Sequence, residues 1–142
     1  MATFLDLAKR IEKKERDLAL SGDAAKRAAV MAFVNEVAVS TPSVTGEHVS
    51  SWQVGIGRPA EGHREPFVEG DADANARLVV EAARRSLRAS RPGTPVYISN
   101  SAPAIVMLNE GFSDQEPAGF VERALLKARL AVERIRTGGY RP

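Results

Sequence analysis

The segment VYISNSAPAIVMLNEGFSDQEPAGF, residues 96–120, decides the fold of the C-terminal half of the chain. It begins with a β-type run, enters a helix of one or two turns at Pro103, and ends in a loop rich in Pro and Gly. Gly111 should cap the short helix, and Pro117 and Gly119 should shape the loop. The segment contains no set of residues suited to catalysis, so it indicates an assembly surface rather than an active site.

A second strand is predicted upstream, where Trp52, Val54 and Ile56 occupy alternate positions. This period of two is typical of a half-buried strand. The stretch Ser-Gly-Asp at 21–23 should end one helix and cap the next. Apolar residues at helical spacing predict four long helices, over residues 3–20, 24–40, 74–90 and 119–136.

These elements predict an α+β fold: a small antiparallel sheet packed against helices, with a long N-terminal helical region and a C-terminal helix. A two-stranded sheet is marginal by itself, so helices or strands of a neighbouring subunit must cover it. Residues 63–70 could add a weak third strand. Because 44% of the residues are hydrophobic, residues 1–142 can bury one core and form a single domain. Within it we expect an N-terminal helix over 1–22, loops over 43–49 and 58–75, and a flexible tail over 137–142.

The predicted C-terminal helix has two apolar faces. Leu126 and Leu130 lie on the face away from the main apolar stripe. A helix that is apolar on two faces must bury both, either within its own domain or under another subunit. The main stripe consists of Val121, Leu125, Ala128, Val132 and Ile135.

Charge is distributed unevenly along a chain whose net charge is only +2. Residues 41–76 contain six Asp or Glu and two Arg, whereas residues 77–100 contain five Arg and one Glu. Complementary contacts between copies are one interpretation; a solvated loop followed by a solvated helix face is the other. The basic helix face could also contact another subunit or DNA phosphates. It comprises Arg77, Arg84, Arg88 and Arg91.

The sequence predicts no catalytic, cofactor or metal site. It contains no Cys, and His48 and His63 lack the spacing of a metal-binding pair. Glu110 follows Asn109 at a predicted helix end, where the helix dipole disfavours an acid. It is either solvated or paired with an Arg of the same or another chain. No apolar run approaches the ~20 residues of a membrane helix, so no membrane partner is expected.

Two groups of short motifs occur in order along residues 28–132. The first is TPSVTG at 41–46 followed by WQV at 52–54. The second is VYISN and Pro103, then LNEGFS at 108–113 and QEPAGFV at 115–121. This ordered set is similar to the pattern of tailed-phage head–tail joining proteins, also called neck or tail-completion proteins.

The resemblance implies a structural virion protein without catalysis. Such proteins form a ring, commonly a hexamer, between the portal–adaptor–stopper stack and the tail tube, and DNA passes through the lumen without sequence reading. The expected partners are further copies of the chain, the head-closure or stopper protein, and the tail-terminator or tail-tube protein. The protein would reside in the neck or tail of the virion after synthesis in the host cytoplasm. Val44 and Glu47 depart from the family pattern, so the Asp–Arg turn contact of that loop is not expected.

Two alternative functions remain open: a tail terminator that caps the tail tube, and a small nucleic-acid-binding module that uses the arginines. The residues expected at a subunit or partner interface are Arg77, Arg84, Arg88, Arg91, Glu110, Phe112, Gln115, Leu126 and Leu130. The residues expected to shape turns and local structure are Pro42, Gly46, Trp52, Pro103, Gly111, Pro117 and Gly119.

Overall fold

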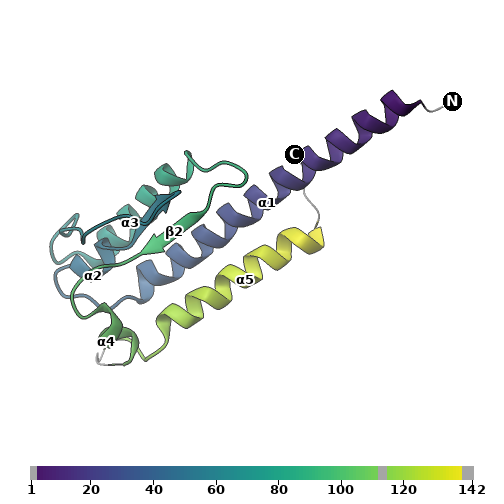
Figure 1. Ribbon diagram of the computed structural model, residues 1–142. Coiled ribbons are helices and arrows are strands. Elements are labelled where there is room, and N and C mark those ends of the chain that lie inside the picture. Colours follow the sequence, from purple (N-terminus) through teal and green to yellow (C-terminus); the bar gives the residue numbers. More distant parts are fainter. Residues whose placement is uncertain (1–2, 112–114, 139–142) are drawn as a thin grey trace.

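The computed structural model describes residues 3–111 and 115–138 (Figure 1). It has an α+β fold, as the sequence predicted, with a small antiparallel sheet packed against helices. The elements follow the order α1 (Phe4–Ser40), α2 (Glu47–Ser50), β1 (Gln53–Ile56), α3 (Ala72–Leu87), β2 (Val96–Ser99), α4 (Ile105–Asn109) and α5 (Phe120–Gly138).

The N-terminal region is one continuous helix, α1, and not the two helices predicted. Thr3 caps its start, because the Thr3 hydroxyl accepts from the Asp6 amide at 3.2 Å and the Asp6 carboxylate accepts from the Thr3 amide at 3.0 Å. The predicted stop at 21–23 fails for a physical reason. Gly22 costs a helix only about 1 kcal/mol relative to Ala and keeps its backbone N–H, so it does not end a helix as Pro would.

Strands β1 and β2 pair antiparallel, with Val54 opposite Ile98 and Ile56 opposite Val96. These four side chains pack against the core, whereas Tyr97 points the other way and is exposed. In the part of the chain that the structure describes, the sheet has only these two strands. The weak third strand suggested for residues 63–70 is therefore wrong.

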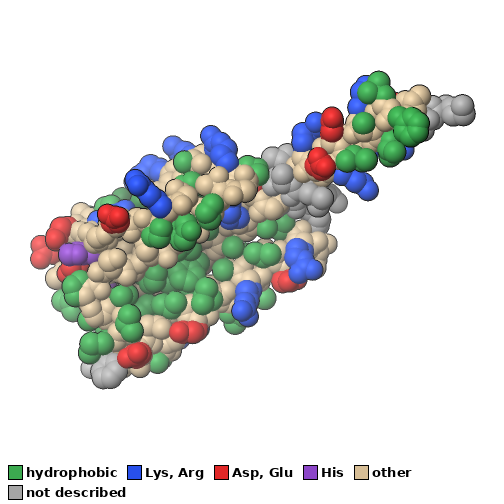
Figure 2. All heavy atoms as spheres, viewed as in Figure 1, with side chains coloured by type: hydrophobic (Ala, Val, Ile, Leu, Met, Phe, Trp, Pro, Cys, Tyr) green, Lys and Arg blue, Asp and Glu red, His purple; other side chains and the backbone are tan. Residues whose placement is uncertain are grey.

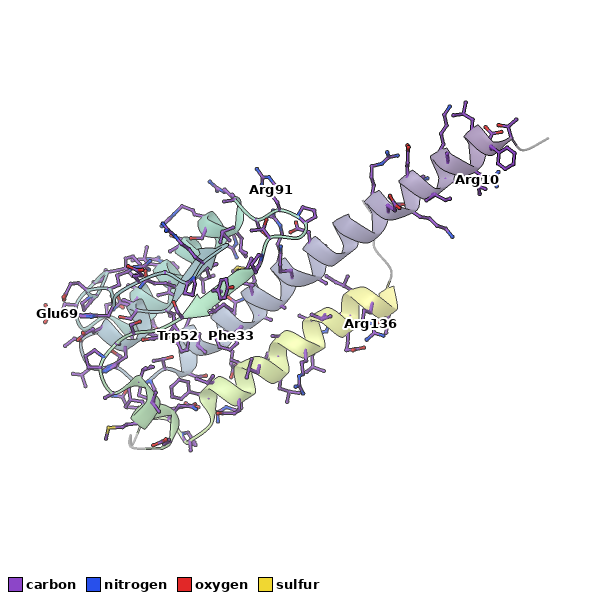
Figure 3. The ribbon with its side chains drawn as sticks, in the orientation of Figure 1. Arg10, Phe33, Trp52, Glu69, Arg91 and Arg136 are labelled. Atoms are coloured by element: carbon purple, nitrogen blue, oxygen red, sulfur yellow. The ribbon has the colours of Figure 1, made fainter. Side chains whose placement is uncertain are left out.

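Helix α1 is the centre of the molecule. Its C-terminal half packs against α3 and the sheet on one side and against α5 on the other, and α5 runs antiparallel to it (Figure 1). The Phe33 ring contacts the Trp52 ring edge to face, with centroids 5.6 Å apart; both rings lie between α1 and the sheet (Figure 3). The buried core consists of Val30, Phe33, Val34, Val37, Ala38, Trp52, Val79, Ala83, Leu87, Phe120 and Ala124.

Helix α5 buries a slightly different face from the one predicted. Phe120 and Ala124 are fully buried, and Val121 and Ala128 pack beside them. Leu125, predicted in the buried stripe, is 53% exposed, so that assignment is wrong. Phe120 and Ala124, one turn apart, occupy the buried face, so Leu125, about 100° further around the helix, points away from it.

Several boundaries differ from prediction. The predicted loop over 43–49 contains the one-turn helix α2, and α3 begins at Ala72 because the Asp71 carboxylate caps it by accepting from the Ala74 amide at 2.9 Å. The acidic loop therefore covers residues 58–71. Helix α5 continues to Gly138, so the tail does not begin at 137; residues 139–142 lie outside the described part.

Candidate functional site

The residues of the first motif group form the junction between α1 and β1. Trp52 donates its indole N–H to the Thr41 hydroxyl at 2.8 Å, and that hydroxyl donates to the carbonyl of Val37 at 2.6 Å. Both side chains are buried, as is Pro42, which follows the end of α1. Trp52 thus joins β1 to the end of α1 through Thr41, and Pro42 lies buried beside this junction.

Gly46 begins α2 in a left-handed conformation, with φ of +102°. A Cβ at this position would lie 2.1 Å from Nδ2 of Asn75. The position therefore requires glycine both for its positive φ and for the lack of space for a Cβ.

Asn75, which the sequence did not single out, holds the acidic loop to the body. Its Oδ1 accepts from the Ser50 hydroxyl at 3.0 Å and from the Val68 amide at 2.9 Å. Its Nδ2 donates to the carbonyls of Val68 at 2.6 Å and Asp71 at 2.9 Å. The side chain is fully buried, and all its hydrogen-bonding capacity is used. The signal in the sequence that could have identified this role is an Asn on an otherwise apolar helix face.

The rest of the acidic loop is also anchored. The Ser51 hydroxyl donates to the Arg64 carbonyl at 3.1 Å and accepts from the Arg64 amide at 3.0 Å. Gln53 donates to the Gly62 carbonyl at 2.9 Å. The backbone is held while Glu61, Glu65 and Glu69 stay exposed, and the acidic side chains gather at one end of the molecule (Figures 2 and 3).

Arg64 lies inside this loop rather than in solvent. Its guanidinium stacks 4.9 Å from the centroid of the Phe67 ring. Burial lowers the pKa of Arg64 from its ordinary value, and the nearby charge of Arg85 lowers it further. The side chain stays charged at neutral pH and serves as part of the loop's packing.

The turn after α4 closes through Asn109. Its carbonyl accepts from the Gly119 amide at 2.8 Å, and its Oδ1 accepts from the Val121 amide at 2.9 Å. Gly111 and Gly119 both have positive φ, and a Cβ on Gly111 would lie 3.2 Å from Cβ of Ala118. Both glycines therefore occupy backbone conformations that favour glycine.

The remaining residues predicted in this turn have separate locations. Pro103 is exposed, and its carbonyl lies 2.7 Å from Nε2 of His48. Gln115 accepts from the Ser43 amide at 2.9 Å, which joins the turn to the start of the first motif loop. Glu110 is exposed and has no ion pair within the described ranges, so a partner on another chain stays a prediction. Pro117 is exposed, and Phe112 lies outside the described residues.

Helix α3 carries the predicted basic face. Arg77, Arg84 and Arg88 are exposed and form no ion pair with any residue that the structure describes. Arg91 turns back on the helix and donates to the carbonyls of Arg88 at 3.1 Å and Ser90 at 2.9 Å. Side chains of Lys and Arg line the upper edge of the body in Figure 2. The basic face lies across α1 from α5, so the structure does not bring it together with Leu126 and Leu130.

Two apolar helix faces are uncovered. We call residues 4–17 of α1 the arm; this part extends beyond the body, and all its side chains are exposed (Figures 1 and 2). Within it, Phe4 is 93% exposed, and Leu7 and Ile11 are about half exposed. We call Leu126 and Leu130 the outer face of α5; they are 56% and 47% exposed. The arm was predicted as an amphipathic helix, but its separation from the body was not.

A polar cluster fixes the base of the arm. The Asp23 carboxylate accepts from Arg27 at 2.7 Å and from the Ser90 hydroxyl at 3.1 Å. Lys26 donates to the carbonyls of Arg91 and Thr94 at 2.8 and 2.7 Å. Burial by itself raises the pKa of Asp23, but the hydrogen bonds from Arg27, Lys26 and Ser90 outweigh it and hold that pKa below its ordinary value.

Metal clusters and membrane-spanning helices are the next two features considered for the described residues. Within residues 3–111 and 115–138, no group of three or more His, Cys, Asp or Glu side chains is arranged to hold a metal ion. Over the same ranges, no helix combines the length and the apolar character needed to cross a bilayer.

The chain was compared with protein-family models, with curated proteins and with solved structures, and none of them matches it.

Proposed function

We propose that this chain is a structural virion protein of a tailed bacteriophage, which forms an oligomeric ring in the neck, joins tail to head and lets DNA pass. The observation that carries the proposal is the pair of uncovered apolar helix faces, the arm and the outer face of α5, on one small chain. Exposed apolar stripes of this kind mark protein–protein contacts.

The residues that carry the family resemblance support the same proposal. Thr41, Gly46 and Trp52 build one buried junction, and Gly111 and Gly119 build the turn before α5. All of them shape the backbone or its packing rather than take part in a reaction. They therefore suit a protein whose function depends on its shape.

The charge distribution supports a ring built from unlike surfaces. The acidic loop and the basic face of α3 lie on different parts of the same chain, and both expose charges that form no ion pair with the residues the structure describes. In a ring, one patch of each copy meets a different patch of the next copy. Opposite charges on the two patches would guide that contact.

The test is to delete the gene for this protein from a phage that carries it. We expect full heads and tails of normal length that do not join, and we expect mass spectrometry of wild-type virions to find the chain. Overlong tails would assign the protein to the tail-terminator layer instead. Absence of the chain from purified virions, together with normal particles in the deletion, would overturn the proposal.

A second candidate function is binding of duplex DNA, because Arg77, Arg84 and Arg88 are exposed and unpaired within the described chain. If these side chains contact phosphates, the double variant Arg84→Ala/Arg88→Ala should reduce the slope of log K against log salt by about 2. The matched control, Arg129→Ala/Arg136→Ala on α5, should leave the slope unchanged. Equal slopes in all three proteins would exclude this function for the basic face.

A further inference from the structure

The arm and the outer face of α5 have the same spacing of apolar side chains. Leu7 and Ile11 lie one turn apart on the arm, and Leu126 and Leu130 lie one turn apart on α5. Residues four apart in a helix stack on one face. The two pairs can therefore meet layer by layer, with Leu7 against Leu130 and Ile11 against Leu126 when the helices run in opposite directions.

The charges that flank the two stripes decide the direction. At about 100° per residue, Lys14 lies on one flank of the arm's stripe and Glu15 on the other. Viewed from its own N-terminus, α5 has Glu122 on the flank where the arm has Lys14, and Arg123 on the flank where the arm has Glu15. When the two helices pack antiparallel, Lys14 lies beside Glu122 and Glu15 lies beside Arg123, so opposite charges meet. Parallel packing would place Lys14 beside Arg123 and Glu15 beside Glu122, so like charges would meet.

The same register that aligns the leucines also aligns these charges. With Leu7 opposite Leu130, Lys14 and Glu15 lie at the same height along the contact as Glu122 and Arg123. Lys14, Glu15 and Glu122 are exposed, and the Glu122 carboxylate also accepts from Nδ2 of Asn109 at 3.1 Å. Arg123 is half-buried and pairs with Glu116 of its own chain, so the Lys14–Glu122 pair is the stronger part of the charge argument. Apolar layers and flanking charges thus agree on one arrangement.

The arm cannot make this contact within its own chain. Helix α1 is continuous, so the arm extends away from the body and cannot fold back onto α5 (Figure 1). Figure 3 shows Arg10 on the arm, well apart from the body. An arm that packs on the outer face must therefore come from another copy.

We propose that the arm of one copy packs antiparallel on the outer face of α5 of the next copy. Because α5 is itself antiparallel to α1, this contact sets the α1 helices of the two copies in the same direction. A reciprocal dimer whose two-fold axis is perpendicular to α1 would instead set the arm parallel to the partner's α5 and oppose like charges. Because the arm extends past the body, the two copies are also offset along α1, which a two-fold axis parallel to α1 does not allow. The contact is therefore head to tail: it continues as a filament when successive α1 helices stay parallel, and it closes into a ring when they are tilted from copy to copy.

This inference rests on the proposed function in that it supplies the subunit contact of the ring. Its test uses purified protein without virions, so the two can fail independently. A head-to-tail protein that is absent from virions would leave the contact standing, and a virion protein without this contact would leave the neck role standing.

The first experiment is disulfide cross-linking, which is clean because the chain contains no Cys. A chain with Leu7→Cys and Leu130→Cys should form a ladder of cross-linked species under oxidation, whereas each single variant should not. The matched control combines Leu130→Cys with Leu5→Cys, because Leu5 is equally exposed but lies on another side of the arm. A ladder of equal yield in the control, or none with Leu7→Cys, would overturn the proposal.

The second experiment is complementation, read by light scattering after gel filtration. One variant has a blocked arm, Leu7→Asp/Ile11→Asp, and the other a blocked outer face, Leu126→Asp/Leu130→Asp. Each should be monomeric alone, and their mixture should stop at a heterodimer with one intact contact. Val44→Asp, on an exposed apolar residue outside both faces, should assemble as the wild type does. A monomeric wild type, or unchanged assembly of either blocked variant, would contradict the contact.

The third experiment tests the direction of packing. Lys14→Glu should weaken association about fivefold, because it places an acid against Glu122. Adding Glu122→Lys in the same chain should restore it. Association that stays weak in the double variant, while the circular dichroism spectrum is that of the wild type, would contradict antiparallel packing.

Discussion

The indole of Trp52 donates a hydrogen bond to the hydroxyl of Thr41 at 2.8 Å, and so ties the residue before β1 to the end of α1. The same hydroxyl donates to the carbonyl of Val37 at 2.6 Å, one turn back in the helix. Thr41 is thus both acceptor and donor in a buried site. The junction that positions the sheet against α1 depends on one oxygen atom.

Thr41→Val should destabilise the protein by about 1–3 kcal/mol, because it leaves the buried indole N–H of Trp52 without an acceptor while preserving side-chain shape. Urea denaturation followed by tryptophan fluorescence measures this directly, since Trp52 is the only Trp. Thr137→Val is the matched control: its hydroxyl is exposed near the end of α5, and we expect a change within about 0.5 kcal/mol. Equal effects of the two substitutions would contradict the role of Thr41.

Asn75→Ala should cost about 2–4 kcal/mol and also free the acidic loop, because it removes four hydrogen bonds, one to Ser50 and three that fix residues 68 and 71. Limited proteolysis should then cleave within residues 58–71 under conditions in which the wild type stays intact. Asn35→Ala on the exposed face of α1 should change neither stability nor cleavage. A loop that stays protected in Asn75→Ala would show that other contacts hold it.

Glycine-to-alanine substitution should have opposite effects at two positions. Gly22→Ala should stabilise the protein by up to about 1 kcal/mol, because Gly22 lies within α1 and a Cβ there meets nothing within 4 Å. Gly46→Ala should destabilise it by more than about 1 kcal/mol, because φ is positive and the new Cβ would meet Asn75. Thermal unfolding by circular dichroism measures both. A lower melting temperature for Gly22→Ala would mean that α1 bends at this residue in solution.

Asp23 should make stability depend on pH in acid. Its folded-state pKa is lowered, so its contribution is present above the unfolded-state value near 4 and is lost as the pH falls through the folded-state pKa. Asp23→Asn should therefore be less stable than the wild type by about 1 kcal/mol at neutral pH, and the gap should close in strong acid. Asp17→Asn, on the exposed arm, should show no such gap. A constant gap at every pH would indicate lost packing instead of lost charge.

Local pattern was sufficient to predict most of the elements. The alternation at Val54 and Ile56 identified β1, and the glycines at 111 and 119 identified the turn before α5. These features depend on residues close in sequence. The fold class followed from them because few arrangements can cover a two-stranded sheet.

The errors came from contacts between residues far apart in the chain. Asp23 looked like a helix cap, but it binds Ser90, 67 residues away, and α1 continues through it. Asn75 looked like one polar residue among many, yet its partners lie on α2 and the acidic loop. Leu125 looked buried, but α5 packs on α1 through the face that contains Phe120 and Ala124. A single sequence contains no direct record of such pairings.

The continuity of α1 also has a mechanical consequence. The arm is joined to the core by uninterrupted helix, with no flexible loop between Phe4 and the buried residues at Phe33 and Val37. A pulling force applied to the arm would therefore load the backbone hydrogen bonds of one helix and then the aromatic contact of Phe33 with Trp52. Gly22 has the lowest helix propensity along this path, so we expect tension to unwind the helix at the base of the arm before it disturbs the core.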